Sequence, residues 1–191
     1  MLHNAEMNTP TDDTIIAETT DWLTRAVIGL NLCPFAKAVH VKKQIRYVVS
    51  HATTPDDLMQ DLLRELDHLA EAHPETTDTT LLIHPHVLND FLDYNDFLEV
   101  ADAAVEELDL EGILQVASFH PQFQFADTEA DDITNYTNRS PYPTLHLLRE
   151  DSVSRAVEAF PEAESIFEKN IATLRKLGHA GWKKVIAGEA S

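Results

Sequence analysis

Helical and strand patterns alternate along almost the whole chain, and this alternation constrains the fold more than any other feature of the sequence. Apolar residues recur at helical spacing over 13–31, whereas the β-branched and aromatic run 44–50 is typical of a strand. Thr11 or Asp12 is the expected cap of the first helix. The further expected helices are about 55–72, about 88–108, one that starts at Asp151 or Ser152, and one opened by Pro161 that ends near Leu177; the further strands are 79–83, 113–119 and 144–149.

Such alternation favours a largely parallel sheet with helices packed on it. We therefore predict an α/β fold with a single small, largely parallel four-stranded sheet flanked by helices. Residues 120–143 have no clear periodicity and predict one long loop before the last strand. No repeat or linker indicates a second domain, so we expect one domain over 12–187, a flexible tail over 1–11 and a short C-terminal tail over 188–191.

Charge and cysteine content restrict the partners. The chain has 14 Lys and Arg against 33 Asp and Glu, a net charge of −19, which argues against binding nucleic acid or an anionic membrane surface. The single cysteine excludes a disulfide within the chain, and no long apolar run indicates a membrane span. With no signal-peptide pattern at the start, we expect a soluble cytoplasmic protein.

Two segments contain no acidic residue in spite of this composition, namely 22–55 and 133–149. On so acidic a chain, two positive segments favour the binding of an anion. The alternative is that both segments are mostly buried and exclude carboxylates for that reason. Their cations are Arg25, Lys37, Lys42, Lys43 and Arg46 in the first segment, and Arg139 and Arg149 in the second.

The long connection holds the candidate binding residues. A loop of this length inside one domain is uncommon and usually functional. Arg139 offers a planar guanidinium suited to carboxylate or phosphate, with Arg149 as a second cation, and Asn135, Asn138 and Ser140 would orient the ligand. The alternative is a self-packed loop in which the Asn and Ser side chains bond to their own backbone.

Histidines follow two of the predicted strands, as His84-Pro85-His86 and His120-Pro121. If the second and third strands are parallel neighbours, His84 and His120 meet at the carboxyl edge, where open α/β sheets bind ligands. We take His120 as the candidate acid, base or donor. Asp131 and Asp132 would be needed to complete a metal shell, but the spacing matches no tight ligand motif and we assign no metal ligand.

Cys33 is the candidate nucleophile. Pro34 fits the first position of a new helical turn, which would make Cys33 its N-cap. The positive helix end, together with Lys37 one turn later, would lower the pKa of the thiol. The alternatives are a thiol against the carbonyl end of the preceding helix, where thiolate is disfavoured, and a small buried apolar side chain.

Four blocks of the sequence carry a resemblance to a known family. Residues 22–36, with Asn-Leu-Cys-Pro-Phe-Ala at their end, and 112–121, 137–153 and 170–182 resemble the bacterial family of proteins of unknown function numbered 1415. The resemblance extends from about Thr14 to Trp182 and implies one intact domain. The family has no established activity, so it implies no mechanism and no catalytic residue.

Two functions stay open at the level of the sequence. The first is the binding of a small anionic metabolite at the carboxyl edge of the sheet. Any catalysis there would rest on His120 and Cys33. The second is a non-catalytic interaction or regulatory module, whose basic segment 37–46 would dock an acidic partner protein. A concave pocket around Cys33, His120 and Arg139 would favour the first function. No cofactor, reaction class or oligomeric state follows from the sequence.

Overall fold

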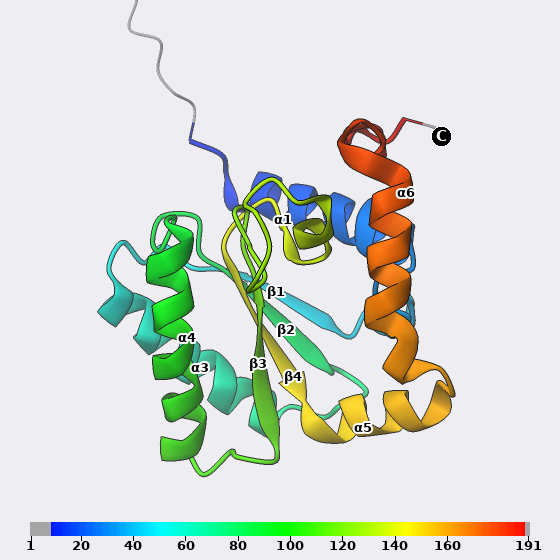
Figure 1. Cartoon of the computed structure of the whole chain (residues 1–191). Coiled ribbons are helices and arrows are strands. Elements are labelled where there is room, and N and C mark those ends of the chain that lie inside the picture. The colour runs from blue at the N-terminus through cyan, green and yellow to red at the C-terminus, as the bar shows by residue number, and fades with distance from the viewer. Residues whose placement is uncertain (1–8, 190–191) are drawn as a thin grey trace, which may run out of the picture.

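Four short apolar and β-branched runs form the strands of one sheet (Figure 1). The protein is seen in a computed structural model that describes residues 9–189. The chain is an α/β fold, and all four predicted strands are confirmed to within one residue at each end, because short β-branched, aromatic and apolar runs between turn residues favour strands. The strands are β1 Ile45–Val49, β2 Thr79–Ile83, β3 Leu114–Phe119 and β4 Thr144–Arg149.

The sheet is mixed, and the prediction of a largely parallel sheet is wrong. The strand order is β1-β2-β4-β3, and only β1 and β2 pair in parallel. β4 lies between β2 and β3 and is antiparallel to both. A parallel fourth strand would need a crossover the length of the sheet. The connection 120–143 holds only the 3₁₀ helix η2 (Ile133–Asn138), so the chain re-enters the sheet from the edge where β3 ended.

Helical spacing and caps explain most of the helices. Thr11 caps the first helix as expected, and Thr54 and Asp90 cap the next long ones through their side-chain oxygens. The expected helix 13–31 continues as a π-helix from Leu23, and the last helix runs on past Gly178, where it kinks. The helices are α1 Asp12–Trp22, π-helix η1 Leu23–Ile28, α2 Ala36–Val41, α3 Pro55–Glu71, α4 Phe91–Glu107, α5 Glu150–Ala159, 3₁₀ helix η3 Ala163–Ser165 and α6 Ile166–Ala187.

One face of the sheet holds the main core. Helices α3 and α4 cover this face, on the left in Figure 1. Strand side chains alternate between the two faces, so every second residue of each strand packs toward these helices. The fully buried members include Leu58, Leu62, Leu66 and Leu69 of α3, Tyr94 and Ala101 of α4, and Leu82, Leu145 and Leu147 of the sheet.

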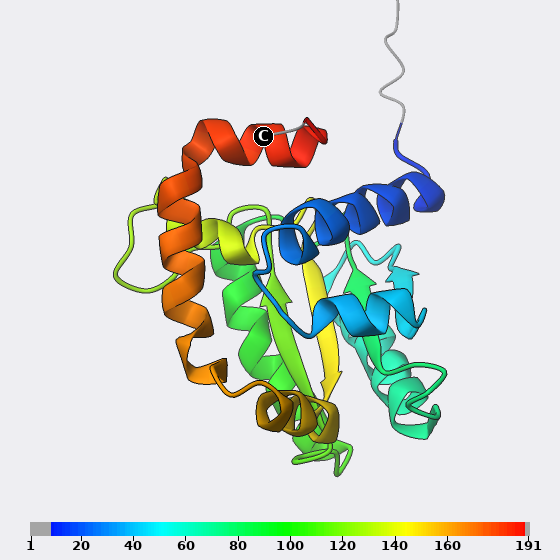
Figure 2. The same ribbon diagram turned by 90° about the vertical axis from the view of Figure 1, so that its right-hand side faces the viewer.

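The opposite face of the sheet is covered less completely. Helices α1, α2, α5 and α6 surround it, as Figure 2 shows. α2 and α5 contribute no buried residue, so they lie over the sheet without filling the space beneath them. None of the helices over 9–189 combines the length and apolar character needed to cross a bilayer. The predicted tail residues 1–8 and 190–191 lie outside the described residues.

Candidate functional site

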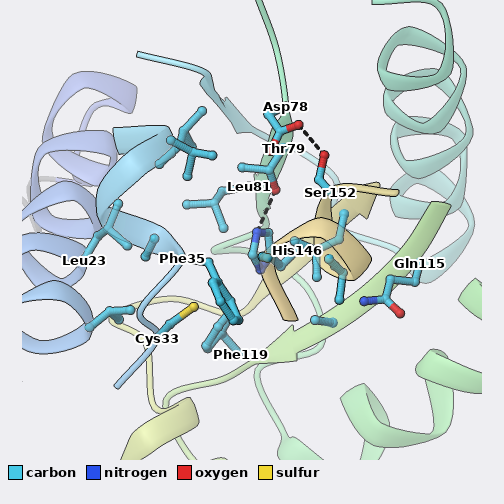
Figure 3. Close-up of a pocket in the computed structure, with 18 of the residues that line it drawn as sticks. Leu23, Cys33, Phe35, Asp78, Thr79, Leu81, Gln115, Phe119, His146 and Ser152 are labelled. Carbon is cyan, nitrogen blue, oxygen red and sulfur yellow. Dashed lines mark hydrogen bonds between the residues drawn. The ribbon is translucent and has the colours of Figure 1, made fainter. Parts of the chain in front are cut away.

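A cavity of about 320 Å³ lies on the second face of the sheet. We call it the inner cavity (Figure 3). Residues from all four strands form its floor. The end of α1, η1, the segment before α2, α2 itself and α5 form its walls. Its lining is mostly apolar and includes Trp22, Leu23, Val27, Phe35, Val39, Ile45, Leu81, Ala117, Phe119, Leu148, Val153 and Ala156.

Small side chains explain why this space is not filled. Ala117 stands at the middle of β3, directly opposite His146 of β4, and Ala36 and Ala156 face the cavity from α2 and α5. Protein interiors are otherwise packed nearly as densely as organic crystals. A void of this size therefore has the dimensions of a ligand pocket and exceeds a packing defect.

His146 is the polar group at the centre of the cavity floor. Its Nε2 lies 2.7 Å from Oγ1 of Thr79, and its ring packs against Phe119 at 5.7 Å between centroids. Burial lowers the pKa of His146 to about 4, because the charged ring would lose its hydration there. The imidazole is accordingly neutral near pH 7 and acts as a hydrogen-bonding group.

A second polar contact closes one end of the cavity. Oγ of Ser152, at the start of α5, donates to Oδ1 of Asp78 at 2.6 Å (Figure 3). This bond ties α5 to the turn before β2. The side chain of Gln115 lies on the floor farther along, on β3.

Cys33 lies at the other end, between the inner cavity and a second one. The second cavity, of about 670 Å³, shares Val27, Cys33 and Phe119 with the first, and we call it the outer cavity. Burial raises the pKa of the Cys33 thiol, and this outweighs hydrogen bonds from the backbone of Phe35 and Ala36 that lower it. The expected low pKa is thus wrong, because desolvation exceeds the effect of the short α2.

We predict that Cys33 reacts slowly with iodoacetamide at pH 7. A half-buried thiol with a raised pKa is almost wholly protonated at that pH, and the thiolate is the nucleophile. The measurement is the pH profile of the alkylation rate, read by mass spectrometry. A rate midpoint below the free value of about 8.5 would contradict the prediction.

The outer cavity has an acidic wall. Asp127, Asp132 and Glu164 line it together with a single cation, Arg175. Hydrogen bonds from the backbone and hydroxyl of Thr134, and the nearby Arg175, lower the pKa of Asp132. An acidic wall disfavours an anion, so the cavities do not support the expected anionic ligand.

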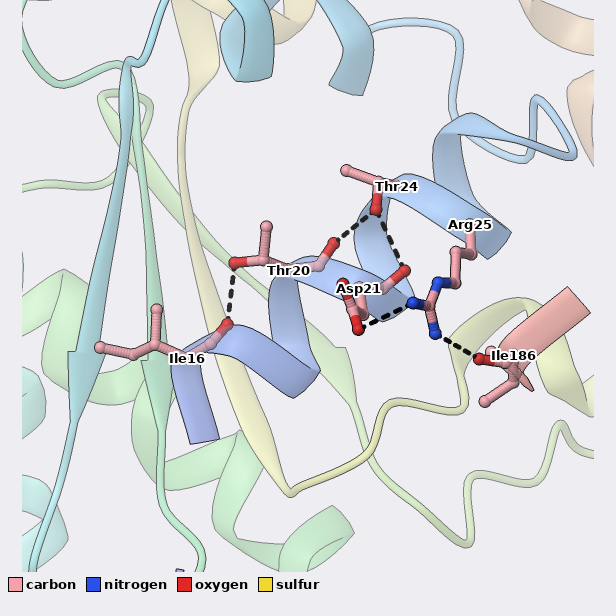
Figure 4. Close-up of polar contacts among 6 residues, drawn as sticks. All are labelled: Ile16, Thr20, Asp21, Thr24, Arg25 and Ile186. Carbon is pink, nitrogen blue, oxygen red and sulfur yellow. Dashed lines mark hydrogen bonds and ion pairs between the residues drawn. The ribbon is translucent and has the colours of Figure 1, made fainter. Parts of the chain in front are cut away.

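The wall made by α1 and η1 is held by threonines and one arginine (Figure 4). The hydroxyls of Thr20 and Thr24 donate to the carbonyls of Ile16 and Thr20, four residues earlier, at 2.8 and 2.9 Å. Such bonds bend helices. These two lie where α1 continues as η1, a π-helix in which hydrogen bonds join residues five positions apart. Arg25 pairs with Asp21 at 3.1 Å and donates to the carbonyl of Ile186 in α6 at 2.8 Å.

Two of the cations in the positive segment 22–55 are therefore already bonded within the fold. Arg25 links η1 to α6 through its hydrogen bond to the carbonyl of Ile186. Arg46 of β1 forms a double hydrogen bond with Glu65 of α3. Lys37, Lys42 and Lys43 are exposed on α2 and the turn that follows it. The acidic partners of both arginines, Asp21 and Glu65, lie outside the segment.

The long connection is packed on itself, as the alternative reading of the sequence expected. Oδ1 of Asn135 accepts from Phe125 and Thr128, and its amide donates to Glu129. The other two polar side chains bond to backbone carbonyls as well: Asn138 donates to Ser118, and Ser140 donates to Tyr142. Of the three, only Asn138 lines either cavity.

Arg139 also serves the connection. Its Nε donates to the carbonyl of Phe123 at 3.0 Å and its Nη2 to the carbonyl of Ala130. The guanidinium lies over the ring of Tyr136 at 4.4 Å, a cation–π contact. These contacts hold the connection closed, and Arg139 lines neither the inner nor the outer cavity.

His84 and His120 do meet at the carboxyl edge, although β4 separates their strands. β1, β2 and β3 run in one direction, so their ends share that edge. Tyr94 joins the two rings, with centroids 5.7 Å from His84 and 4.9 Å from His120. Both nitrogens of His120 are bonded, Nδ1 to the N–H of Gln122 and Nε2 to the carbonyl of Leu88, each at 3.0 Å. His120 thus links two loops and has no free nitrogen for a proton transfer.

Arg149 lies at the opposite edge of the sheet from Arg139. Its guanidinium donates to the carbonyls of Leu69, Ala72 and Thr77 at 2.6 to 3.0 Å. The first two of these carbonyls belong to the C-terminal end of α3, where backbone acceptors lack helical partners. Arg149 is therefore a buried cap of α3, and the structure does not bring it to the predicted site.

The two polar groups at the centre of the cavity floor are not among the site residues predicted from the sequence. His146 and Thr79 were read only as strand residues, and their pairing joins positions 67 apart in the chain. A lone histidine inside the apolar run of β4 was the available signal. Over residues 9–189, no three His, Cys, Asp or Glu side chains are grouped closely enough to hold a metal ion.

Comparison with known proteins identifies a family and no activity. The model of a family described as a protein of unknown function, DUF1415, matches residues 14–184. This range contains every strand of the sheet and both cavities. No curated protein and no solved structure matches the chain.

Proposed function

We propose that this chain, which belongs to the DUF1415 family of proteins of unknown function, binds a small and largely apolar molecule in the inner cavity. One observation carries the proposal: about 320 Å³ of space with mostly apolar walls lies on a sheet whose other face is tightly packed. Ligand pockets are concave and mainly apolar, with a few polar groups that orient the ligand. His146 and Thr79 supply such groups here.

The ligand is neutral in this proposal. No Lys or Arg lines the inner cavity, and the outer cavity next to it has three acidic side chains against one arginine. An anion would enter against that charge and find no cation inside. The positive charge expected from Arg139 and Arg149 is directed at backbone carbonyls instead.

The proposal concerns binding and assigns no reaction. Cys33 lines the cavity, but His120 and Arg139 do not, so the three candidate groups do not surround one pocket. His146 has its pKa lowered by burial to about 4 and is a weak base near neutral pH. Binding alone accounts for every feature of the inner cavity described above.

Simple aromatic compounds provide the first test. Burying about 150 Å² of ring surface contributes about 4 kcal/mol, which corresponds to about millimolar affinity before the entropic costs of association. We expect p-xylene or p-cresol to shift the NMR signals of residues on the cavity floor. Both compounds should also raise the thermal midpoint as their concentration increases.

A filled-cavity variant makes the test specific. Ala117→Leu places three more carbons on the cavity floor and should weaken binding at least tenfold without loss of the fold. The matched control is Ala163→Leu, which adds the same atoms to the wall of the outer cavity and should leave binding unchanged. Equal binding by wild type and Ala117→Leu would refute the proposal, as would the absence of binding to wild type.

A further inference from the structure

The hydrogen bonds of Thr79 determine which nitrogen of His146 carries the proton. Oγ1 of Thr79 lies 2.7 Å from Nε2 of His146 and 2.7 Å from the carbonyl oxygen of Leu147. A threonine hydroxyl has one proton, and a carbonyl oxygen can only accept. The hydroxyl therefore donates to Leu147, and both contacts are hydrogen bonds only if Nε2 of His146 is protonated and donates to Thr79.

Nδ1 of His146 is consequently left with a lone pair. Neutral imidazole has one N–H and one acceptor nitrogen, and burial keeps this ring neutral near pH 7. Among residues 9–189, no group donates a hydrogen bond to Nδ1, and the His146 side chain lines the inner cavity. Nδ1 is not one of the fully enclosed unpaired polar atoms of residues 9–189, so it is accessible from the cavity, and a ligand with a suitable proton would give it the hydrogen-bond partner that the protein does not.

Building on the proposed function, we propose that the ligand is a neutral molecule with an apolar body and a hydroxyl group, a phenol or an alcohol, that donates to Nδ1 of His146. The apolar body would lie against Leu81, Leu148 and Phe119 on the same floor. Two further acceptors lie at the cavity: Oδ1 of Asp78 already accepts from Ser152, and the amide oxygen of Gln115 lies farther along the floor. An ether, ketone or carboxylate has no proton for Nδ1 and would place its own lone pair there.

Two isosteric probes isolate the hydroxyl. p-Cresol and p-xylene differ only by OH in place of CH₃, and water solvates p-cresol better, so apolar burial alone favours p-xylene. We expect wild type to bind p-cresol at least tenfold more tightly than p-xylene, measured by NMR titration. His146→Phe keeps an aromatic ring without the nitrogens and should lose this preference.

Gln115→Leu is the matched control, because Gln115 is another polar side chain on the cavity floor. This variant should keep the preference for p-cresol if the hydroxyl donates to His146. A preference that disappears in Gln115→Leu and persists in His146→Phe would assign the hydroxyl to the glutamine and overturn the inference.

The histidine tautomer can be read without any variant. The ¹⁵N chemical shifts of His146 in wild type should show a protonated Nε2 and a bare Nδ1, and a protonated Nδ1 would overturn the inference. Equal affinities of p-cresol and p-xylene for wild type would also overturn it but leave the proposed function intact. Failure of both probes to bind would refute the proposed function itself.

Discussion

Arg149→Ala is expected to lower the free energy of unfolding by about 3 kcal/mol or more. Arg149 is 9% exposed, and the two protons of its Nη2 are shared among three backbone carbonyls at the end of α3 and in the turn before β2. Hydrogen bonds from a charged donor contribute about 1.5–3 kcal/mol each, and the carbonyls left behind are largely buried. The change should appear as a fall in thermal midpoint of roughly 10 °C and in the urea midpoint.

Arg139→Ala is the matched control for this prediction. Arg139 also donates to backbone carbonyls, but it is only partly buried and holds a surface connection. Its loss should cost about 1 kcal/mol, since water can replace these bonds. A similar loss of stability in both variants would show that Arg149 does not cap α3 in the way described.

Acid is expected to destabilise the protein well before most carboxylates are protonated. Burial lowers the pKa of His84 and of His146 to about 4, against about 6.5 in the unfolded chain. As the pH falls below 6.5 the unfolded state binds protons that the folded state does not. The stability is therefore complete above pH 6.5 and decreases toward pH 4, by about 3 kcal/mol for each histidine.

Urea unfolding at several pH values between 7 and 4.5 measures this loss. His146→Gln should reduce the slope by about one proton, because one buried histidine no longer titrates. His120, whose pKa is lowered mainly by burial, adds to the same trend. Constant stability from pH 7 to 4.5 would show that these rings accept protons in the folded protein.

The fold was predictable where the evidence is local. A helix start is marked by Thr11, a helix face by the leucines of α3, and the strand ends by the turn residues around β2. Each of these signals acts over only a few residues. The direction of β4 could not be predicted from local sequence patterns. It depends on whether 120–143 forms a long crossover helix, and its polar residues bond to their own backbone instead.

The candidate site was predictable only in part for a related reason. Cys33 was singled out from the sequence, and it lines both cavities. His120, Arg139 and Arg149 were singled out by the same chemical reasoning, yet their polar atoms bond to backbone groups of the fold. A side chain that can bind a ligand can equally satisfy a buried carbonyl, and the sequence does not distinguish the two.

The sequence by itself determined the α/β class, the strand bounds and most helix starts, because backbone periodicity and capping act over a few residues. Tertiary structure alone decided the mixed sheet, the cavity under α1, α2 and α5, and the pairing of Thr79 with His146. These features depend on contacts between distant segments, such as the bond from Arg149 to Leu69, and on the volume left between helices that do not fill the space above the sheet.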